Sequence, residues 1–249
     1  MQHDPNDPSQ GQTLIEHLSE LRDRLIKAAW AIAVGTLLCW AFSEVIFNIV
    51  RQPIAPFLSL DGLVFTNPID KFMAHLKVAT LGGIVLACPV WIYQAWMFVA
   101  PGLYSHERKY SIMFITAGSV LFMVGFCFAY FLVLPTAFKF LLTFGGTTDK
   151  PMITINEYLS FFMTTTLVFG AAFELPMVIV CLGAIGIVDQ RFLRTNRRYA
   201  VVAMAVLSAI ITPPDLLSML LLLVPLWALY EISILLVGMI AKKKLQSQQ

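Results

Sequence analysis

Charged residues are scarce in this sequence, and their scarcity excludes an ordinary soluble protein. Asp, Glu, Lys and Arg make up 13% of the 249 residues, whereas an average soluble domain has about 25%. Hydrophobic residues make up 58% of the chain. This composition is typical of a polytopic membrane protein. The net charge of +2 says little, because in membranes the distribution of charge matters more than its sum.

Features that would indicate an enzyme or a metalloprotein are also missing. The four cysteines, Cys39, Cys88, Cys127 and Cys181, lie inside apolar runs without a C-x-x-C pair, which is typical of small core residues. No G-x-S-x-G, H-E-x-x-H or Walker sequence occurs. No His or Lys lies deep in an apolar run beside a Ser, as an intramembrane protease dyad would require. We therefore expect no catalytic residue, no cofactor and no metal.

The N-terminal part is polar and then amphipathic. Residues 1–12 have no apolar stretch after basic residues, so we expect a disordered segment without a cleavable signal peptide. Thr13 and Glu16 form a capping box, and leucines at 14, 18, 21 and 25 then share one helical face. An amphipathic helix over residues 13–25 is expected to lie along the membrane surface and to continue into the first span.

Six membrane-spanning helices are predicted, which makes the fold an all-α membrane domain over residues 13–241 with a cytoplasmic tail at 242–249. The spans are expected near residues 26–47, 68–99, 110–134, 158–182, 199–211 and 216–240. Asn67 and Pro68 are expected to begin the second span, Pro89 to kink it, and Pro135 to end the third. A short interfacial helix is expected over residues 50–58. No inverted repeat is visible, which argues against common transporter architectures.

The last two spans are expected to be short. A full crossing needs about 20 apolar residues, whereas residues 199–211 supply 13, and residues 216–230 supply 15 before Glu231. We expect a concave bundle in which the bilayer thins around these helices or their ends lie in protein.

Basic residues fall mainly on one side of this arrangement. That side carries Arg22, Arg24, Lys27, Arg108, Lys109, Arg191, Arg194, Arg197, Arg198, Lys242, Lys243 and Lys244. The opposite loops carry Arg51, Lys71, Lys139 and Lys150, with Lys77 just inside a helix. The positive-inside rule therefore places both termini in the cytoplasm.

Two acidic residues on the cytoplasmic side form the first candidate site. Glu20 lies on the amphipathic helix, and Glu107 lies in the loop after the second span. Because a carboxylate on a loop rimmed by aromatic residues can bind a guanidinium, helix and loop are predicted to dock a basic peptide. The alternatives are that Glu20 pairs with Arg24 at i+4 and that Glu107 pairs with Arg108 or with a Lys.

Glu174 is the second candidate, because a carboxylate in the middle of a membrane costs roughly several kcal/mol and so needs a polar cavity or a partner. The threonines at 164–166 lie about two to three turns earlier, and Pro176 frees the carbonyl of Ala172. Together they predict a polar concavity. The alternative is a protonated side chain that is hydrogen-bonded to a neighbouring helix.

Four short motifs occur in order along almost the whole chain: HLSELRDRL at residues 17–25, APGLYSHER at 100–108, FELP at 173–176 and TPPD at 212–215. Through them the chain resembles the TatC family, the multispanning receptor subunits of the twin-arginine protein translocase. Any one motif alone would be weak evidence. Outside these motifs, Asp70 stands where many family members carry Glu.

The resemblance implies a receptor in the bacterial cytoplasmic (inner) membrane and no enzymatic activity. It implies binding of twin-arginine signal peptides of folded cargo at the cytoplasmic face, recruitment of TatA-like and TatB-like single-span partners, export driven by the proton-motive force, and a homo-oligomer without nucleic acid. The residues implied for signal-peptide binding are Glu20, Arg22, Phe98, Leu103, Glu107 and Tyr130. Those implied for partner-helix docking are Glu174, Met204 and Ala205. Structural roles are expected for Pro53, for Asp215 as the N-cap of the last helix, and for Glu231 as the partner of a loop arginine.

Two other classes of protein remain as alternatives. A proton-coupled or ion-coupled transporter of small solutes would use Glu174 as its proton site, and it would line a central path with polar residues. An insertase-like scaffold would have a hydrophilic groove without an acidic receiver for arginine.

Overall fold

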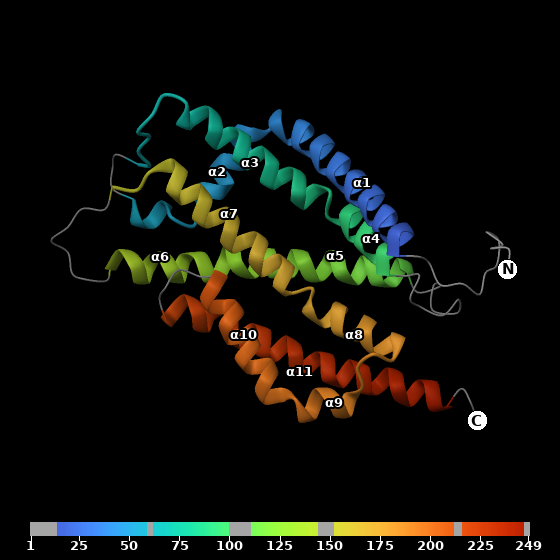
Figure 1. Ribbon diagram of the computed structural model, residues 1–249. Helices are drawn as coiled ribbons and strands as arrows, with labels where there is room; N and C mark the ends of the chain where they lie inside the picture. Colours follow the sequence, from blue (N-terminus) through green and yellow to red (C-terminus); the bar gives the residue numbers. More distant parts are fainter. Residues whose placement is uncertain (1–13, 59–61, 100–110, 144–151, 212–215, 247–249) are drawn as a thin grey trace.

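The computed structural model describes residues 14–58, 62–99, 111–143, 152–211 and 216–246 (Figure 1). In these residues the chain is helical, apart from connections and one isolated β-bridge between Val64 and Thr154. The elements are α1 (Leu14–Trp40), α2 (Ser43–Arg51), a 3-10 turn (Ala55–Phe57), α3 (Asp70–Leu86), α4 (Cys88–Val99), α5 (Ser111–Phe128), a π-helical turn (Ala129–Val133), α6 (Leu134–Thr143), α7 (Ile155–Ala172), α8 (Leu175–Ile185), α9 (Gln190–Thr195), α10 (Arg197–Ile211) and α11 (Leu216–Gln246). The predicted all-α class is confirmed, while Thr13 of the expected capping box lies outside the described residues.

The first span ends earlier than predicted. α1 stops at Trp40, and α2 leaves it at an angle of 89°. At this bend the Phe42 N–H donates to the carbonyl of Cys39, three residues back, which tightens the last turn. The prediction of a span to residue 47 was wrong because the apolar run continues through the bend without a Gly or Pro. The expected interfacial helix at 50–58 corresponds to α2 and the 3-10 turn, and it starts earlier.

α3 and α4 form one bent pair that packs along α1. The bend of 57° lies at Ala87, two residues before Pro89, so the predicted kink is confirmed. α3 begins at Asp70 and not at Pro68, because the Asp70 carboxylate accepts hydrogen bonds from the backbone N–H groups of Thr66 and Asn67 (3.0 and 2.9 Å). α1 and α3 lie side by side (Figure 1).

The predicted end of the third span at Pro135 is wrong. The chain continues as a candidate span of 30 residues from Phe114 to Thr143. In the π-helical turn the Leu134 N–H donates to the carbonyl of Ala129, five residues back. This wider turn shifts the hydrogen-bond register just before Pro135, so the missing proline N–H falls in the first turn of α6, where it is tolerated.

α7 and α8 form a candidate span from Ile155 to Gly183, broken at Phe173 and Glu174. Thr154 caps α7 by accepting the Glu157 N–H at 3.2 Å. The predicted single helix is therefore two helices, because Pro176 lies in the first turn of α8, a position that needs no N–H donor.

α10 has 15 residues and is short, as predicted. The expectation of a short sixth span is wrong, because α11 has 31 residues and its stretch Met219–Met239 is apolar enough to span a membrane. Glu231 does not interrupt α11, since its carboxylate lies beside Arg197 at the start of α10, at 2.7 Å.

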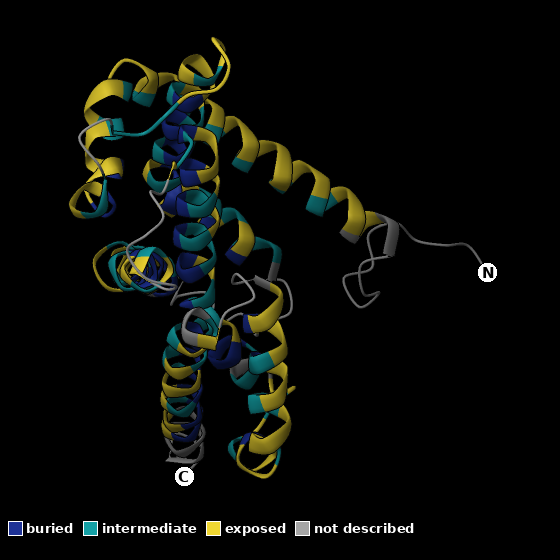
Figure 2. Ribbon diagram, turned by 90° about the vertical axis from the view of Figure 1, so that its left-hand side faces the viewer, coloured by how far each residue is buried: buried dark blue, intermediate teal, exposed yellow. Residues whose placement is uncertain are grey.

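By length and composition, the described residues contain three helices able to cross a membrane, or up to five if each bent pair is one span. The predicted count of six stays a prediction. In Figure 1, α5 and α7 lie between a group formed by α1 to α4 and a group formed by α8 to α11. Among the described residues of α1 only Gly35 is buried, and Figure 2 shows this helix at the edge of the bundle, mostly exposed and leading toward the N-terminus.

Candidate functional site

Glu20 lies in an ion pair on the surface of α1. Its Oε1 accepts a hydrogen bond from Arg24 Nη2 at 2.8 Å, and the two side chains are only 22% and 19% exposed. Arg24 Nη1 also lies 3.5 Å from Gln94 Oε1 on α4, which is the limit of a hydrogen bond. The alternative that Glu20 pairs with Arg24 at i+4 is therefore realised in the structure.

The structure describes only some of the other residues that are expected at the peptide site. Glu107 and Leu103 lie outside the described residues, so the pairing of Glu20 with Glu107 stays a prediction. Arg22 is exposed and bonds its neighbour Asp23 at 3.0 Å. Phe98 is half-buried near the end of α4, the helix that Arg24 contacts.

Tyr130 is not beside Glu20. Its hydroxyl donates to the carbonyl of Ile49 on α2 at 2.8 Å, beyond the far end of α1. About 20 residues of α1 separate Glu20 from Trp40, and at 1.5 Å per residue they span roughly 30 Å of helix. Tyr130 instead borders an apolar hollow of about 420 Å³ between α1, α2, α3, α5, the π-helical turn and α7.

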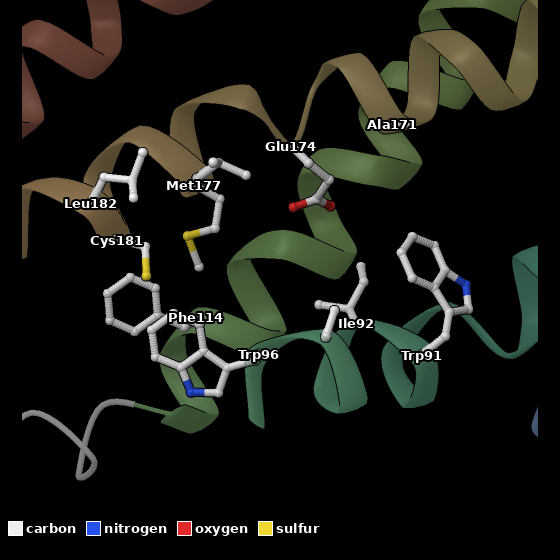
Figure 3. A pocket seen from close by; sticks show the side chains of 11 residues that line it. Trp91, Ile92, Trp96, Phe114, Ala171, Glu174, Met177, Cys181 and Leu182 are labelled. Atoms are coloured by element: carbon white, nitrogen blue, oxygen red, sulfur yellow. The ribbon is translucent and has the colours of Figure 1, made fainter. Parts of the chain in front are cut away.

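Glu174 borders a cavity of about 380 Å³ between α4, α5, α7 and α8 (Figure 3). Its lining is Trp91, Ile92, Ala95, Trp96, Phe114, Ala171, Glu174, Met177, Val178, Cys181 and Leu182. In Figure 3 the carboxylate points from the turn between α7 and α8 toward the side where α4 carries Ile92. Its Oε1 is buried and has no hydrogen-bond partner among the described residues. Glu174 is the only charged side chain in this lining.

The prediction of a polar concavity is wrong, because the cavity is lined by apolar and aromatic side chains apart from Glu174. The threonines at 164–166 do not line the cavity. Thr166 is fully buried and donates to the carbonyl of Phe162 in its own helix at 2.8 Å. A hydroxyl in a membrane helix is commonly satisfied by such a bond within the helix, so these threonines add no polar surface near Glu174.

Aromatic residues form one wall of the cavity. Trp96 stacks on Phe114 with ring centroids 4.3 Å apart, and it is 7% exposed. Its Nε1 is buried without a hydrogen-bond partner among the described residues. Trp91 is fixed by a hydrogen bond from its Nε1 to the carbonyl of Ile84 at 3.1 Å. The sequence could not show this wall, because it forms between α4 and α5.

Gly118 on α5 leaves room for the Glu174 carboxylate. A Cβ atom at Gly118 would lie 3.1 Å from Glu174 Oε2 and 3.2 Å from Ile92 Cγ2. A larger residue would push the carboxyl group or the α4 wall aside. A glycine within an apolar helix was the one sequence signal for this contact, and its partner could not be read from the sequence.

Met204 and Ala205 lie on α10, away from the Glu174 cavity lining. Met204 is 4% exposed and belongs to a core that also includes residues of α4, α5, α7, α8, α9 and α11, while Ala205 is half-buried. The exposed side of α10 carries a different stripe, which we call the α10 stripe: Tyr199, Val202, Val206 and Ile210, exposed by 59, 62, 53 and 75%.

The remaining predicted residues hold elements together. Pro53 is buried in the turn after α2. Glu231 pairs with Arg197, so the predicted partner is found among the arginines expected there. Asp215 lies outside the described residues. Within the described part of the chain, no group of three or more His, Cys, Asp or Glu residues could hold a metal ion.

The fold is that of a helical membrane protein with two candidate sites. One candidate site is the half-buried ion pair of Glu20 and Arg24 beside Gln94 of α4, and the other is a carboxyl group in an apolar cavity between helices. The family model described as "Sec-independent protein translocase protein (TatC)" matches residues 16–225. The chain belongs to the TatC family, and it is a component of a protein translocase and not an enzyme.

Relatives of known name cover nearly all of the chain. The TatC protein of Desulforapulum autotrophicum is 40% identical over 230 residues, 92% of this chain and 85% of the relative. That of Carboxydothermus hydrogenoformans is 40% identical over 238 residues, 95% of this chain and 97% of the relative. A crystal structure of a "Twin Arginine Translocase Receptor- TatC" superposes with a TM-score of 0.77 at 38% identity, covering 90% of this chain and 99% of the other.

Proposed function

We propose that this chain is the receptor subunit that binds twin-arginine signal peptides of folded cargo at its cytoplasmic face. It then recruits TatA-like and TatB-like single-span partners for export driven by the proton-motive force. Its place is the bacterial cytoplasmic membrane, with both termini in the cytoplasm, where it works as a homo-oligomer. Family membership and the solved TatC receptor that the chain resembles support this proposal.

The signal arginines bind at Glu20 and Glu107. A guanidinium presents a planar fork of donors, so a pair of adjacent arginines needs two carboxylates that each offer both oxygens. Of the two carboxylate oxygens of Glu20, Oε1 accepts a hydrogen bond from Arg24 among the described residues, and Oε2 accepts none. Oε2 of Glu20 can therefore make the first contact with an incoming guanidinium. A lysine at the same place offers a point charge without the fork.

A partner helix docks at the Glu174 cavity. The observation that supports this step best is the buried Oε1 without a partner in a cavity whose other lining residues are uncharged. A buried polar atom without a hydrogen bond costs about 1–3 kcal/mol. A polar side chain on a single-span partner would supply the missing hydrogen bond, and lipid offers neither group a better alternative. Met204 and Ala205 on α10, with the exposed α10 stripe beside them, form a second part of the partner interface.

Site-directed crosslinking tests both steps. A photoreactive twin-arginine peptide is expected to crosslink to wild type and to lose crosslinking in Glu107→Ala, while Glu107→Asp is intermediate because the charge stays but its reach shortens. A cysteine at Val178, exposed on α8 one turn from Glu174, reports the partner helix. An unchanged crosslinking pattern in Glu174→Ala would refute docking through the carboxyl group.

The alternative of a small-solute transporter has less support. It requires polar residues along a path through the membrane, whereas the Glu174 cavity is lined by apolar and aromatic side chains apart from the carboxyl group. Transport of a small solute coupled to protons, lost in Glu174→Gln, would support it.

A further inference from the structure

We propose that Arg24 is an internal competitor of the signal peptide, which occupies the Glu20 carboxylate until a peptide arginine displaces it. This inference rests on the proposed peptide binding at Glu20. It assigns to Arg24 the role of setting the affinity of the site for the peptide, although Arg24 does not itself bind the peptide arginine.

The first support is the geometry of the pair. Arg24 binds Glu20 through one nitrogen and one oxygen, Nη2 to Oε1, at 2.8 Å. A single contact of this kind leaves most of the guanidinium donors unused, whereas a free guanidinium can bind a carboxylate through two parallel hydrogen bonds. A peptide arginine therefore replaces a weaker contact with a stronger one.

The second support is that the rest of the Arg24 guanidinium is poorly satisfied. Its Nε is buried without a hydrogen-bond partner among the described residues. Its Nη1 reaches Gln94 Oε1 only at 3.5 Å, the limit of a hydrogen bond. A guanidinium with so few hydrogen bonds can be displaced by a better-bonded one, and Gln94 on α4 is positioned to receive Arg24 when a peptide arginine binds Glu20.

The third support is the burial of the pair. The side chains of Glu20 and Arg24 are 22% and 19% exposed, so water screens them less than a surface pair. By contrast, Arg22 and Asp23 on the same helix are 70% and 55% exposed. Displacement of Arg24 consequently has a measurable effect on peptide affinity. It raises the threshold that any cationic ligand must exceed to bind Glu20.

The test measures binding of a twin-arginine peptide and its twin-lysine variant to the full-length protein in nanodiscs. Arg24→Gln is expected to bind the twin-arginine peptide about fivefold more tightly than wild type, the factor at the upper end for an exposed ion pair. Arg24→Lys keeps a cation beside Glu20 and is expected to stay near wild type.

Two matched variants separate displacement from general electrostatics. Lys27→Gln removes the same charge from the same hollow on α1, whose lining includes Glu20 and Arg24, but in the described part of the chain Lys27 forms no ion pair with Glu20. Glu20→Gln removes the contested carboxylate. The proposal requires that the gain in Arg24→Gln exceeds that in Lys27→Gln and vanishes in the Glu20→Gln background.

The outcomes distinguish the two proposals. If wild type prefers the twin-arginine peptide and Glu20→Gln weakens binding, but Arg24→Gln binds no more tightly than Lys27→Gln, the competitor role is refuted and peptide binding at Glu20 stands. A gain that persists without Glu20 also refutes it. If wild type binds both peptides equally and Glu20→Gln changes nothing, binding at Glu20 fails, and the competitor role fails with it.

Discussion

Glu174→Met is expected to make the isolated protein more stable and its partner docking weaker. The substitution removes the buried Oε1, which has no hydrogen-bond partner among the described residues. It keeps an unbranched side chain that fits an irregular apolar cavity lined by residues such as Ile92 and Met177. A residue kept at the expense of stability is the pattern of a functional site.

The magnitude follows from the one unsatisfied oxygen. Leaving a buried acceptor unpaired costs about 1–3 kcal/mol. Because Glu174 is partly exposed to the cavity, we take the lower end, a gain of about 1 kcal/mol in the free energy of unfolding. For a chain of this size that gain corresponds to a rise in Tm of roughly 2–4 °C.

Thermal unfolding of the purified protein in one detergent, without partners, measures this effect. Glu174→Gln is the matched control, since its amide keeps a polar group in the same cavity and is expected to show no such gain. A loss of stability in Glu174→Met by 2 °C or more (the lower end of that shift) would show that the carboxyl group is already satisfied inside the chain, and the docking argument would lose its basis.

Three further substitutions test the packing that positions the sites. Gly118→Ala is expected to weaken partner crosslinking at Val178, because its Cβ would lie 3.1 Å from Glu174 Oε2; unchanged crosslinking would contradict this placement. Gly83→Val is expected to destabilise the protein by about 1–3 kcal/mol in denaturant unfolding, since a Cβ there would lie 2.5 Å from the Thr36 nitrogen on α1. A neutral effect would show that α1 and α3 separate easily. Tyr158→Phe removes the buried hydroxyl that donates to the carbonyl of Val50, so the free energy of unfolding should fall by about 1 kcal/mol. An equal or higher stability would show that this hydrogen bond does not stabilise the packing of α7 on the end of α2.

Hydropathy and proline positions predicted much of the fold, and their failures have physical causes. Pro89 marked a real bend. Pro135 did not end its helix, because the π-helical turn before it shifts the hydrogen-bond register so that no proline N–H is needed. Such a turn has no clear sequence signal. The bend of 89° after Trp40 carries neither Gly nor Pro. It arises where α2 packs on α3, a tertiary contact that a local pattern does not contain.

The sequence predicted the key residue of each candidate site but not the residues that surround it. Glu174 stood out because ionisable groups are rare in membranes. Its cavity combines Trp96 and Phe114 from separate helices, so only the fold brings them together. The pair of Glu20 with Arg24 was predictable from its spacing, since residues four apart share a helical face. The contact of Arg24 with Gln94 was not, because it joins two helices.

The central claim, that this chain is a receptor for twin-arginine signal peptides, is tested most directly by one affinity ratio. The dissociation constants of a twin-arginine peptide and of its twin-lysine variant are measured on the full-length protein in nanodiscs. The account predicts tighter binding of the twin-arginine peptide by about tenfold or more, the factor for one charge-assisted hydrogen bond of ~1.5 kcal/mol. It also predicts that Glu107→Ala abolishes the preference. Equal affinities for the two peptides in wild type would contradict it.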